Sequence, residues 1–438
     1  MINKRVFTVA IAALFVFSAL VAFIPANESE GADPEWMPEA AVMEPGDAFY
    51  SITEPGHLVW MQLAEVSPGT EFRLMKDLDL SEKMFPASII GAHAFTHTFN
   101  GNGFSITGLK IESSGEAGLF KNIGIGGLVE DLTLKNPIVS STGNNVGGIA
   151  SESSGAIKKC AVIGGTITGN IAVGGIVGHV LDRGSLSECY NTSTVKGGSN
   201  WIGGIVGQYY SSMPVTKCFN MGSVSGEAIV AGIIGLNYNA ANVTYCYNSG
   251  VISGTNPTAG MISGIVGNNY STGTISNVYN IGTLTGSRQT DICGQNLKGT
   301  IESAYWLAAT ANDKGGRTAV QMSGNGALGE MPGFDRLVWK TMDNAGEPYY
   351  APQLIVFTAS GVSDQTVAIS LESVKITSGG SGGGSQEGPG GSGEPEGPGG
   401  TGGDNPDDGG DNTMLYIGVA AVAVVAVIGL LWFFVLKP

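Results

Sequence analysis

The side chains best suited to ligand binding in this sequence are tyrosines and asparagines that recur at one place in a repeat. Each tyrosine follows a Gly-Ile-Val-Gly tetrapeptide or a close variant of it. The aligned residues are Tyr210, Tyr238 and Tyr270, with Asn237 and Asn269 beside two of them. Aromatic rings pack against the C–H faces of sugars, and amides hydrogen-bond sugar hydroxyls. We therefore predict a glycan-binding surface at these five residues. The alternative is that the tyrosines pack back against their own repeat.

Residues for catalysis are scarce. Each of the four histidines is followed by Leu, Ala, Thr or Val, so the His-Glu-x-x-His signature of zinc peptidases is absent. His93 and His97 are four positions apart but have no third ligand near them in the sequence. The few acidic residues between positions 145 and 300 fall at different places in the repeat, so they should not converge as the carboxylates of a glycosidase do. We predict no enzyme activity, no cofactor and no metal site.

Four of the five cysteines share one position of the repeat. They are Cys160, Cys189, Cys218 and Cys246, and Val278 and Ala304 follow at the same position. A position that accepts Val and Ala predicts a buried column of thiols that behave as small apolar groups. Disulfides between neighbouring repeats are the alternative in an extracellular protein. In-register Cβ atoms would be about 4.8 Å apart, which is wider than the ~3.8 Å that a disulfide prefers.

The repeat itself predicts the fold. Its most regular feature is a Gly-apolar pair whose apolar member recurs every 27 to 32 residues. In order, these apolar residues are Leu119, Ile149, Ile176, Ile205, Ile233, Ile265 and Ile292. Each unit has several glycines and alternating β-branched residues, and none has a run of ten good helix formers, so helical repeats are excluded.

One repeat therefore corresponds to one coil of a parallel β-helix, or β-solenoid, of about 28 residues. Equivalent residues of successive coils should stack at about 4.8 Å. The isoleucines then form a column in the core. A second column at a corner should be a ladder of asparagines, formed by Asn191, Asn220, Asn248 and Asn280.

The repeats resemble the GLUG-motif repeats of bacterial and archaeal surface proteins. The resemblance is carried by Gly-Gly-Ile-Val-Gly followed by Cys-Tyr-Asn-x-Gly-x-Val-x-Gly, and it covers roughly residues 50–358. It implies a β-solenoid and a location at the cell surface. It implies no particular activity, because the motif occurs in adhesins, in IgA-specific metallopeptidases and in proteins of no known role.

The two ends of a solenoid need covers, because open strand edges pair with other chains. We assign residues 50–71 to an N-terminal cap with a short helix, in which Thr53 precedes Pro55 as the helix N-cap. Residues 72–310 are assigned to the solenoid. Residues 311–376 bring apolar side chains after the last coil and are assigned to a C-terminal cap.

The termini indicate targeting. Residues 1–26 have the basic start and apolar run of a secretory signal peptide, although the run is long enough to remain as an uncleaved anchor. Residues 415–436 are uncharged and would span roughly 33 Å as a transmembrane helix. Lys437 after this run and the acidic residues before it place the C-terminus in the cytoplasm and the bulk of the chain outside.

The net charge of −16 belongs mostly to two flanking segments. Residues 27–49 form an acidic, disordered lead, and residues 377–412 form a Gly-, Pro- and acid-rich tether before the transmembrane run. The repeats between them are close to neutral. No basic patch occurs, so nucleic acid is not an expected partner.

Together these features predict a single-pass cell-surface protein with a β-solenoid outside the membrane. Its expected role is that of an adhesin-like or structural interaction module, and its expected partners are surface glycans or proteins of another cell or of the envelope. The alternatives are a surface enzyme that degrades polysaccharide and a purely architectural protein of the cell envelope. Of the four Asn-x-Ser/Thr sequons, Asn242 and Asn269 are the predicted glycosylation sites, because Asn191 belongs to the asparagine ladder.

Overall fold

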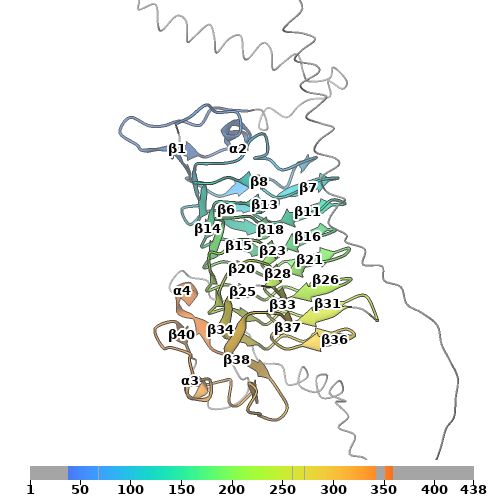
Figure 1. Ribbon diagram of the computed structural model, residues 1–438. Coiled ribbons are helices and arrows are strands. Elements are labelled where there is room, and N and C mark those ends of the chain that lie inside the picture. Colours follow the sequence, from blue (N-terminus) through green and yellow to red (C-terminus); the bar gives the residue numbers. More distant parts are fainter. Residues whose placement is uncertain (1–37, 68, 259, 271, 342–350, 359–438) are drawn as a thin grey trace, which may run out of the picture. The chain divides into compact units, whose positions relative to one another are not determined.

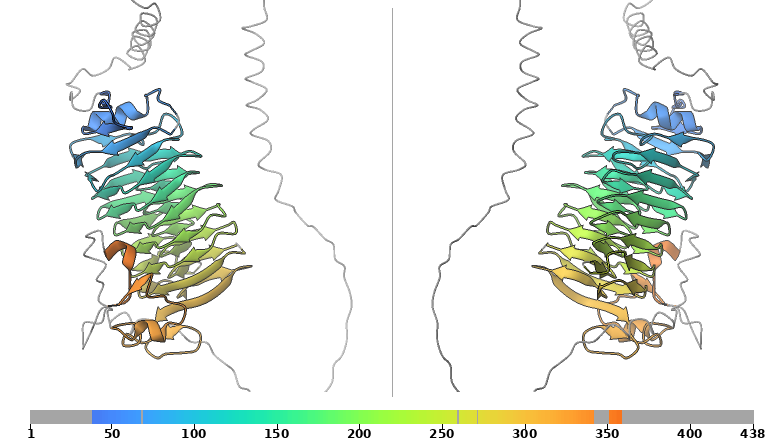
Figure 2. Two further views of the ribbon diagram at one scale, coloured as in Figure 1. Left: turned by 90° about the vertical axis from the view of Figure 1, so that its left-hand side faces the viewer. Right: turned by 90° about the vertical axis from the view of Figure 1, so that its right-hand side faces the viewer.

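The computed structural model describes residues 38–67, 69–258, 260–270, 272–341 and 351–358. These residues form a parallel β-solenoid in which each coil contributes several short strands (Figure 1). Figure 2 shows the coils stacked in chain order, from the blue N-terminal end to the orange C-terminal segment. Several predicted segments lie outside the described residues. They are the signal peptide or anchor (1–26), the tether (377–412) and the transmembrane helix (415–436). Of the acidic lead (27–49), only residues 38–49 are described.

The described strands of the solenoid stack in five columns. The first column contains β12 (Val146–Gly147), β17 (Val173–Gly174), β22 (Ile202–Gly203), β27 (Ile229–Ala231), β32 (Met261–Ser263) and β36 (Arg288–Thr290). The second contains β8 (Phe120–Ile123), β13 (Ala150–Ser153), β18 (Val177–Val180), β23 (Val206–Tyr209), β28 (Ile234–Asn237), β33 (Val266–Asn269) and β37 (Cys293–Asn296). The third contains β1 (Phe49–Ile52), β2 (Glu71–Leu74), β5 (Thr98–Asn100), β9 (Leu128–Glu130), β14 (Ala156–Lys158), β19 (Ser185–Ser187), β24 (Val215–Thr216), β29 (Val243–Thr244), β34 (Thr274–Asn280) and β38 (Thr300–Leu307).

Around the next corner lies the fourth column. It contains β3 (Leu78–Asp79), β6 (Ser105–Thr107), β10 (Thr133–Lys135), β15 (Ala161–Ile163), β20 (Tyr190–Asn191), β25 (Phe219–Asn220) and β30 (Tyr247–Asn248), continues through the long strands β34 and β38, and ends at β39 (Gly316–Arg317). The fifth contains β4 (Met84–Phe85), β7 (Lys110–Ser113), β11 (Ile138–Ser141), β16 (Thr166–Gly169), β21 (Thr194–Gly197), β26 (Val224–Gly226), β31 (Ile252–Gly254) and β35 (Leu284–Thr285).

The predicted register of the coils is confirmed. The main-chain N–H of Ile176 donates to the carbonyl of Ile205 at 3.1 Å, and Ile205 donates in the same way to Ile233 at 3.1 Å. Both neighbours and Ile205 itself are fully buried. The column of isoleucines therefore runs through the core as the spacing predicts.

The asparagine ladder is also confirmed. The Nδ2 atom of Asn191 donates to Oδ1 of Asn220, Asn220 donates to Asn248, and Asn248 donates to Asn280, each at 2.9 Å. All four side chains are buried. Each amide is thus paired along the stack, so these buried polar groups stabilise the coil spacing instead of costing free energy.

The cysteine column is buried in the same core. Cys160, Cys189, Cys218 and Cys246 have no exposed surface, and all five cysteines are free thiols in this structure. The Sγ atom of Cys189 lies 3.2 Å from the carbonyl oxygen of Ser187, and burial raises the pKa of its thiol. The thiols act as small core side chains.

A short helix covers the N-terminal end as predicted, but its N-cap is not the predicted residue. Helix α2 spans Pro55–Met61 with Glu54, not Thr53, at the N-cap. The Thr53 N–H instead donates to Nδ1 of His57 at 3.1 Å, so the backbone enters the helix one residue later. No helix among the described ranges is long and apolar enough to cross a membrane.

The C-terminal segment folds back along the side of the solenoid. It contains helix α3 (Ala327–Glu330), the antiparallel pair β40 (Trp339–Lys340) and β41 (Gln353–Leu354), and helix α4 (Ile355–Thr358). In Figure 1, α4 lies beside coils that are well above the last one. We call the described part of residues 318–358 the strap.

Candidate functional site

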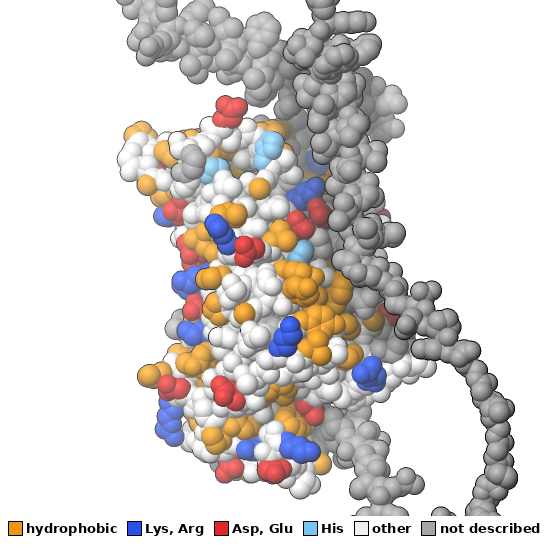
Figure 3. All heavy atoms as spheres, viewed as in Figure 1, with side chains coloured by type: hydrophobic (Ala, Val, Ile, Leu, Met, Phe, Trp, Pro, Cys, Tyr) orange, Lys and Arg blue, Asp and Glu red, His pale blue; other side chains and the backbone are white. Residues whose placement is uncertain are grey.

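The three predicted tyrosines form one surface on the solenoid, which we call the tyrosine face. Each follows a strand of the second column: Tyr210 follows β23, Tyr238 follows β28 and Tyr270 follows β33. The rings of Tyr210 and Tyr238 stack with centroids 4.6 Å apart, and those of Tyr238 and Tyr270 meet at 6.3 Å and a steep angle. Tyr238 is 48 % exposed, and the other two are half-buried. Figure 3 shows apolar side chains gathered over the middle coils.

Polar groups border the tyrosine face. At one end the ring of His179 meets that of Tyr210 at 5.0 Å, and His179 Nδ1 lies 3.7 Å from Glu152 Oε1. The contact with His179 lowers the pKa of Glu152, so this carboxylate is charged at neutral pH. Under Tyr270, Asn268 Nδ2 lies 3.2 Å from the tyrosine hydroxyl. The buried Oδ1 of Asn268 has no hydrogen-bond partner among the described residues. The face thus combines rings with donors and acceptors.

The two asparagines predicted beside the tyrosines point the other way. Asn237 and Asn269 are fully buried, with Asn237 Nδ2 donating to Asn269 Oδ1 at 2.9 Å and Asn269 Nδ2 donating to Asn296 Oδ1 at 2.8 Å. They form a second, internal asparagine ladder. Successive residues of an extended chain point to opposite sides, so the tyrosine that follows each asparagine faces outward. The amides of Asn237 and Asn269 are therefore not available to a ligand.

The same placement sharpens the prediction for glycosylation. Asn242 is exposed, and its Oδ1 accepts a hydrogen bond from the Thr274 N–H at 2.8 Å, while Asn191 and Asn269 are fully buried. In a host that glycosylates, we expect a glycan on Asn242 and none on Asn191 or Asn269, measured by mass spectrometry of intact glycopeptides. A glycan on Asn269 would show that the internal ladder is open in solution.

The sequence did not predict that the aromatic residue of the Cys-Tyr-Asn motif packs on the outside of the coils. Its ring stacks on the equivalent ring of the next coil at 4.8 Å, and the stacked residues are Tyr190, Phe219, Tyr247 and Tyr279. The strap covers this stack: Phe357 contacts Tyr190 and Phe219, and the Tyr279 hydroxyl donates to the Pro352 carbonyl at 2.6 Å. A second apolar core lies there, outside the coils. These rings are covered and differ in this from the tyrosine face.

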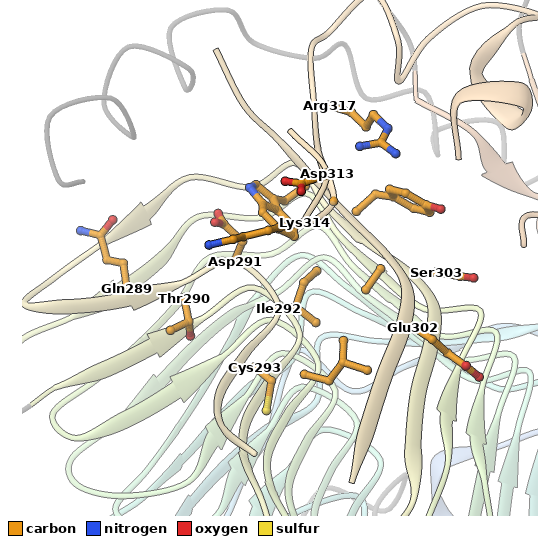
Figure 4. A pocket seen from close by; sticks show the side chains of 15 residues that line it. Gln289, Thr290, Asp291, Ile292, Cys293, Glu302, Ser303, Asp313, Lys314 and Arg317 are labelled. Atoms are coloured by element: carbon orange, nitrogen blue, oxygen red, sulfur yellow. The ribbon is translucent and has the colours of Figure 1, made fainter. Parts of the chain in front are cut away.

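A cavity at the C-terminal end of the stack was also not foreseen. Its volume is about 540 Å³, within the range of small-ligand pockets. Asp291 of the last coil lines it, together with Trp306 and three charged residues of the segment that follows, Asp313, Lys314 and Arg317 (Figure 4). Burial raises the pKa of Asp291 to about 6. We call this cavity the end pocket.

His97 packs edge-on against Phe72 and Phe95, with ring centroids 5.8 and 5.7 Å away, and burial lowers its pKa. The described residues contain no cluster of three or more His, Cys, Asp or Glu side chains that could hold a metal ion.

Comparison with known proteins supports the resemblance seen in the repeats. The family described as the GLUG motif matches residues 169–196. Halomucin from Haloquadratum walsbyi is 32 % identical over 151 residues, which cover 32 % of this chain but only 2 % of halomucin. The chain therefore corresponds to a small part of that relative.

Two solved structures are similar at low identity. A putative immunoglobulin A1 protease from Bacteroides ovatus aligns with a TM-score of 0.45 and 18 % identity, over 70 % of this chain and 92 % of that one. The structure of an IgA1 protease aligns with a TM-score of 0.41 and 16 % identity, over 76 % of this chain and 25 % of that one.

The register of the coils, the two asparagine ladders and the match of residues 169–196 all describe the same repeat. The chain contains a GLUG motif at residues 169–196, and its repeats, which resemble that motif, form a parallel β-solenoid.

Proposed function

We propose that this protein is an adhesin-like module of the cell surface and that its tyrosine face binds glycans. The observation that carries the proposal is the stacked, partly exposed row of Tyr210, Tyr238 and Tyr270 on a solvent-facing side of the solenoid. The likeness to GLUG-repeat surface proteins supports the location. Membrane attachment through residues 415–436, with the C-terminus in the cytoplasm, is part of the same proposal.

The solenoid suits this role because it holds the rings in place before a ligand arrives. The tyrosine N–H groups are tied to the preceding coil: Tyr238 donates to the Tyr209 carbonyl and Tyr270 to the Asn237 carbonyl, both at 2.9 Å. A preformed surface loses little conformational entropy on binding. Successive rings along the coil axis would contact successive sugar units of one chain.

Part of the tyrosine surface is used for packing within the protein. The residues two positions earlier, Gln208, Leu236 and Asn268, are nearly buried, although they lie at the edge of the face. The exposed half of Tyr238 is the part available to a ligand, so this residue is the one to test.

Glycan binding should depend on the ring of Tyr238. We expect the purified full chain to bind members of a glycan array, and Tyr238→Ala to weaken binding of the best glycan about two- to ten-fold in calorimetry, because one ring contact contributes roughly 0.5–1.5 kcal/mol. Tyr238→Phe keeps the ring and should bind nearly as the wild type does.

Ile138→Ala is the matched control, since Ile138 is 46 % exposed and belongs to β11, in a different column. It should leave binding unchanged. If no glycan binds, the tyrosine face is a packing surface and the architectural role is favoured. Release of reducing sugar from a polysaccharide panel would instead favour the enzyme alternative.

A further inference from the structure

The last coil has an aspartate, Asp291, where the regular coils have a glycine that lets the next coil stack closely. In the regular coils this position is glycine, and a Cβ atom there would lie about 2 Å from the carbonyl oxygen of the next coil: 2.2 Å for Gly204 and 2.0 Å for Gly264. The oxygen that Gly264 faces is that of Asp291, so Asp291 occupies the same position one coil later. A side chain fits at this position because no further coil stacks on Asp291 within the described part of the chain.

At the end of the stack, two main-chain N–H groups have no partner among the described residues. In the preceding coil, the N–H groups of Gly264 and Ile265 donate to the carbonyls of Thr290 and Ile292, both at 3.1 Å. The equivalent N–H groups of Asp291 and Ile292 have no acceptor within the described part of the chain. By the repeat symmetry they point along the stacking direction, to where the next coil would present its carbonyls.

The strands on either side of Asp291 are edge strands. β36 is the last strand of its column and β37 the last of the next one. Among the described residues, β39 adds to β38, and no strand pairs with the free side of β36 or β37. An unpaired edge of this kind accepts an extended peptide as an additional strand.

The charges around the end pocket favour a basic partner. Its lining contains the carboxylates of Asp291, Glu302 and Asp313, and no ion pair within 4.0 Å is found for any of them among the described residues. Of the two cations, Arg317 is already engaged. Its Nε donates to the Glu330 carbonyl at 2.7 Å, and its guanidinium lies over the ring of Tyr305 at 4.9 Å.

Figure 4 shows how the pocket is built. Asp291 comes from the last coil, whereas Asp313, Lys314 and Arg317 come from the segment that crosses the end of the stack. Asp291 is half-buried, so water would screen a cation placed on it less than at a fully exposed carboxylate.

A second copy of this chain is a poor occupant. Its N-terminal end carries α2, whose residues Leu58 and Met61 are buried against the first coils, so that end is closed. Two C-terminal ends facing each other would bring two Asp291 carboxylates together, and like charges at close range are unfavourable.

We propose that the open C-terminal end of the solenoid binds an extended segment of another protein, which pairs with β36 and β37 as an added strand and places a lysine or arginine side chain on Asp291. The site is separate from the tyrosine face and does not depend on the function proposed for it.

The test uses the full chain, purified in detergent, and synthetic nine-residue peptides of sequence Thr-Val-Ser-Val-X-Val-Ser-Val-Thr, in which X is Lys, Ala or Glu. Binding is measured by fluorescence anisotropy. We expect the Lys peptide to bind at least tenfold more tightly than the Glu peptide. N-methylation of alternate amides on the edge that would face β36 and β37 should weaken the Lys peptide at least tenfold, because it removes strand hydrogen bonds without changing charge.

Asp291→Asn keeps the shape of the side chain and removes its charge. It should reduce the preference for Lys over Ala to less than twofold, and a thermal melt checks that the variant folds. Asp182→Asn, at an exposed carboxylate of an earlier coil, is the control and should leave all affinities unchanged. The proposal is wrong if no peptide binds, if N-methylation has no effect, or if glucosamine binds with an Asp291 dependence that the peptides lack.

Discussion

Ile205→Asp is expected to open the central coils or to prevent folding. Ile205 is fully buried between Ile176 and Ile233, and no basic side chain belongs to this column. An unpaired carboxylate there would cost several kcal/mol even after the structure relaxes. The total free energy of unfolding of a domain is often only about 5–15 kcal/mol. The substitution should therefore remove much of the stability of the solenoid.

The matched control is Lys196→Asp, in β21 just before Ile205 in the chain. Lys196 is exposed, so this substitution should change the free energy of unfolding by about 0.5 kcal/mol or less. Thermal melts followed by circular dichroism compare the two variants. Equal melting temperatures would mean that the inward and outward positions of the coil are wrongly assigned.

The coil register could be predicted because the same physical requirement is repeated along the chain. A column needs one kind of side chain in every coil, so Ile149, Ile176 and Ile205 reveal the period without any tertiary information. The asparagine ladder follows in the same way, because an amide both donates and accepts and can pair with its own copy. Each further coil repeats the same residue types at the same spacing, which makes the register easier to predict.

The direction of individual side chains was harder to predict. Tyr209 and Tyr210 are adjacent and identical, yet Tyr209 is fully buried and its hydroxyl lies 2.8 Å from the Met213 carbonyl oxygen, whereas Tyr210 faces outward. A phase error of one residue exchanges the two sides of a strand. For this reason the sequence grouped Asn237 and Asn269 with the tyrosines, although they belong to the interior.

The strap and the end pocket could not be predicted because they depend on contacts between unlike segments. Apolar residues such as Trp339 and Phe357 were assigned to a cap, but nothing periodic tells which surface they cover. The Tyr279–Pro352 hydrogen bond joins residues 73 positions apart. The end pocket likewise exists only because the segment containing Lys314 crosses the last coil.

Gly204→Ala is expected to destabilise the solenoid by about 3 kcal/mol, although it adds only one methyl group. An ideal Cβ at Gly204 would lie 2.2 Å from the carbonyl oxygen of Gly232 and 2.4 Å from Cγ of Asn220. Both neighbours are fixed, the first by the backbone and the second by the hydrogen bonds of the asparagine ladder. Overpacking of this kind costs roughly 1–3 kcal/mol, and disturbing the buried amide adds about 1–3 kcal/mol.

The control is Gly115→Ala, because a Cβ at Gly115 meets nothing within 4 Å. Neither glycine has a left-handed φ, so alanine is not strained by the backbone conformation at either position. The difference between the two melting temperatures therefore isolates the steric effect. Gly115→Ala should change the free energy of unfolding by less than about 1 kcal/mol, since alanine fits the space and restricts the unfolded chain. Equal melting of the two variants would show that the coils can separate to admit a side chain. The glycine column would then not explain why the stack ends at Asp291, and the argument for an open strand edge beside that residue would lose its basis.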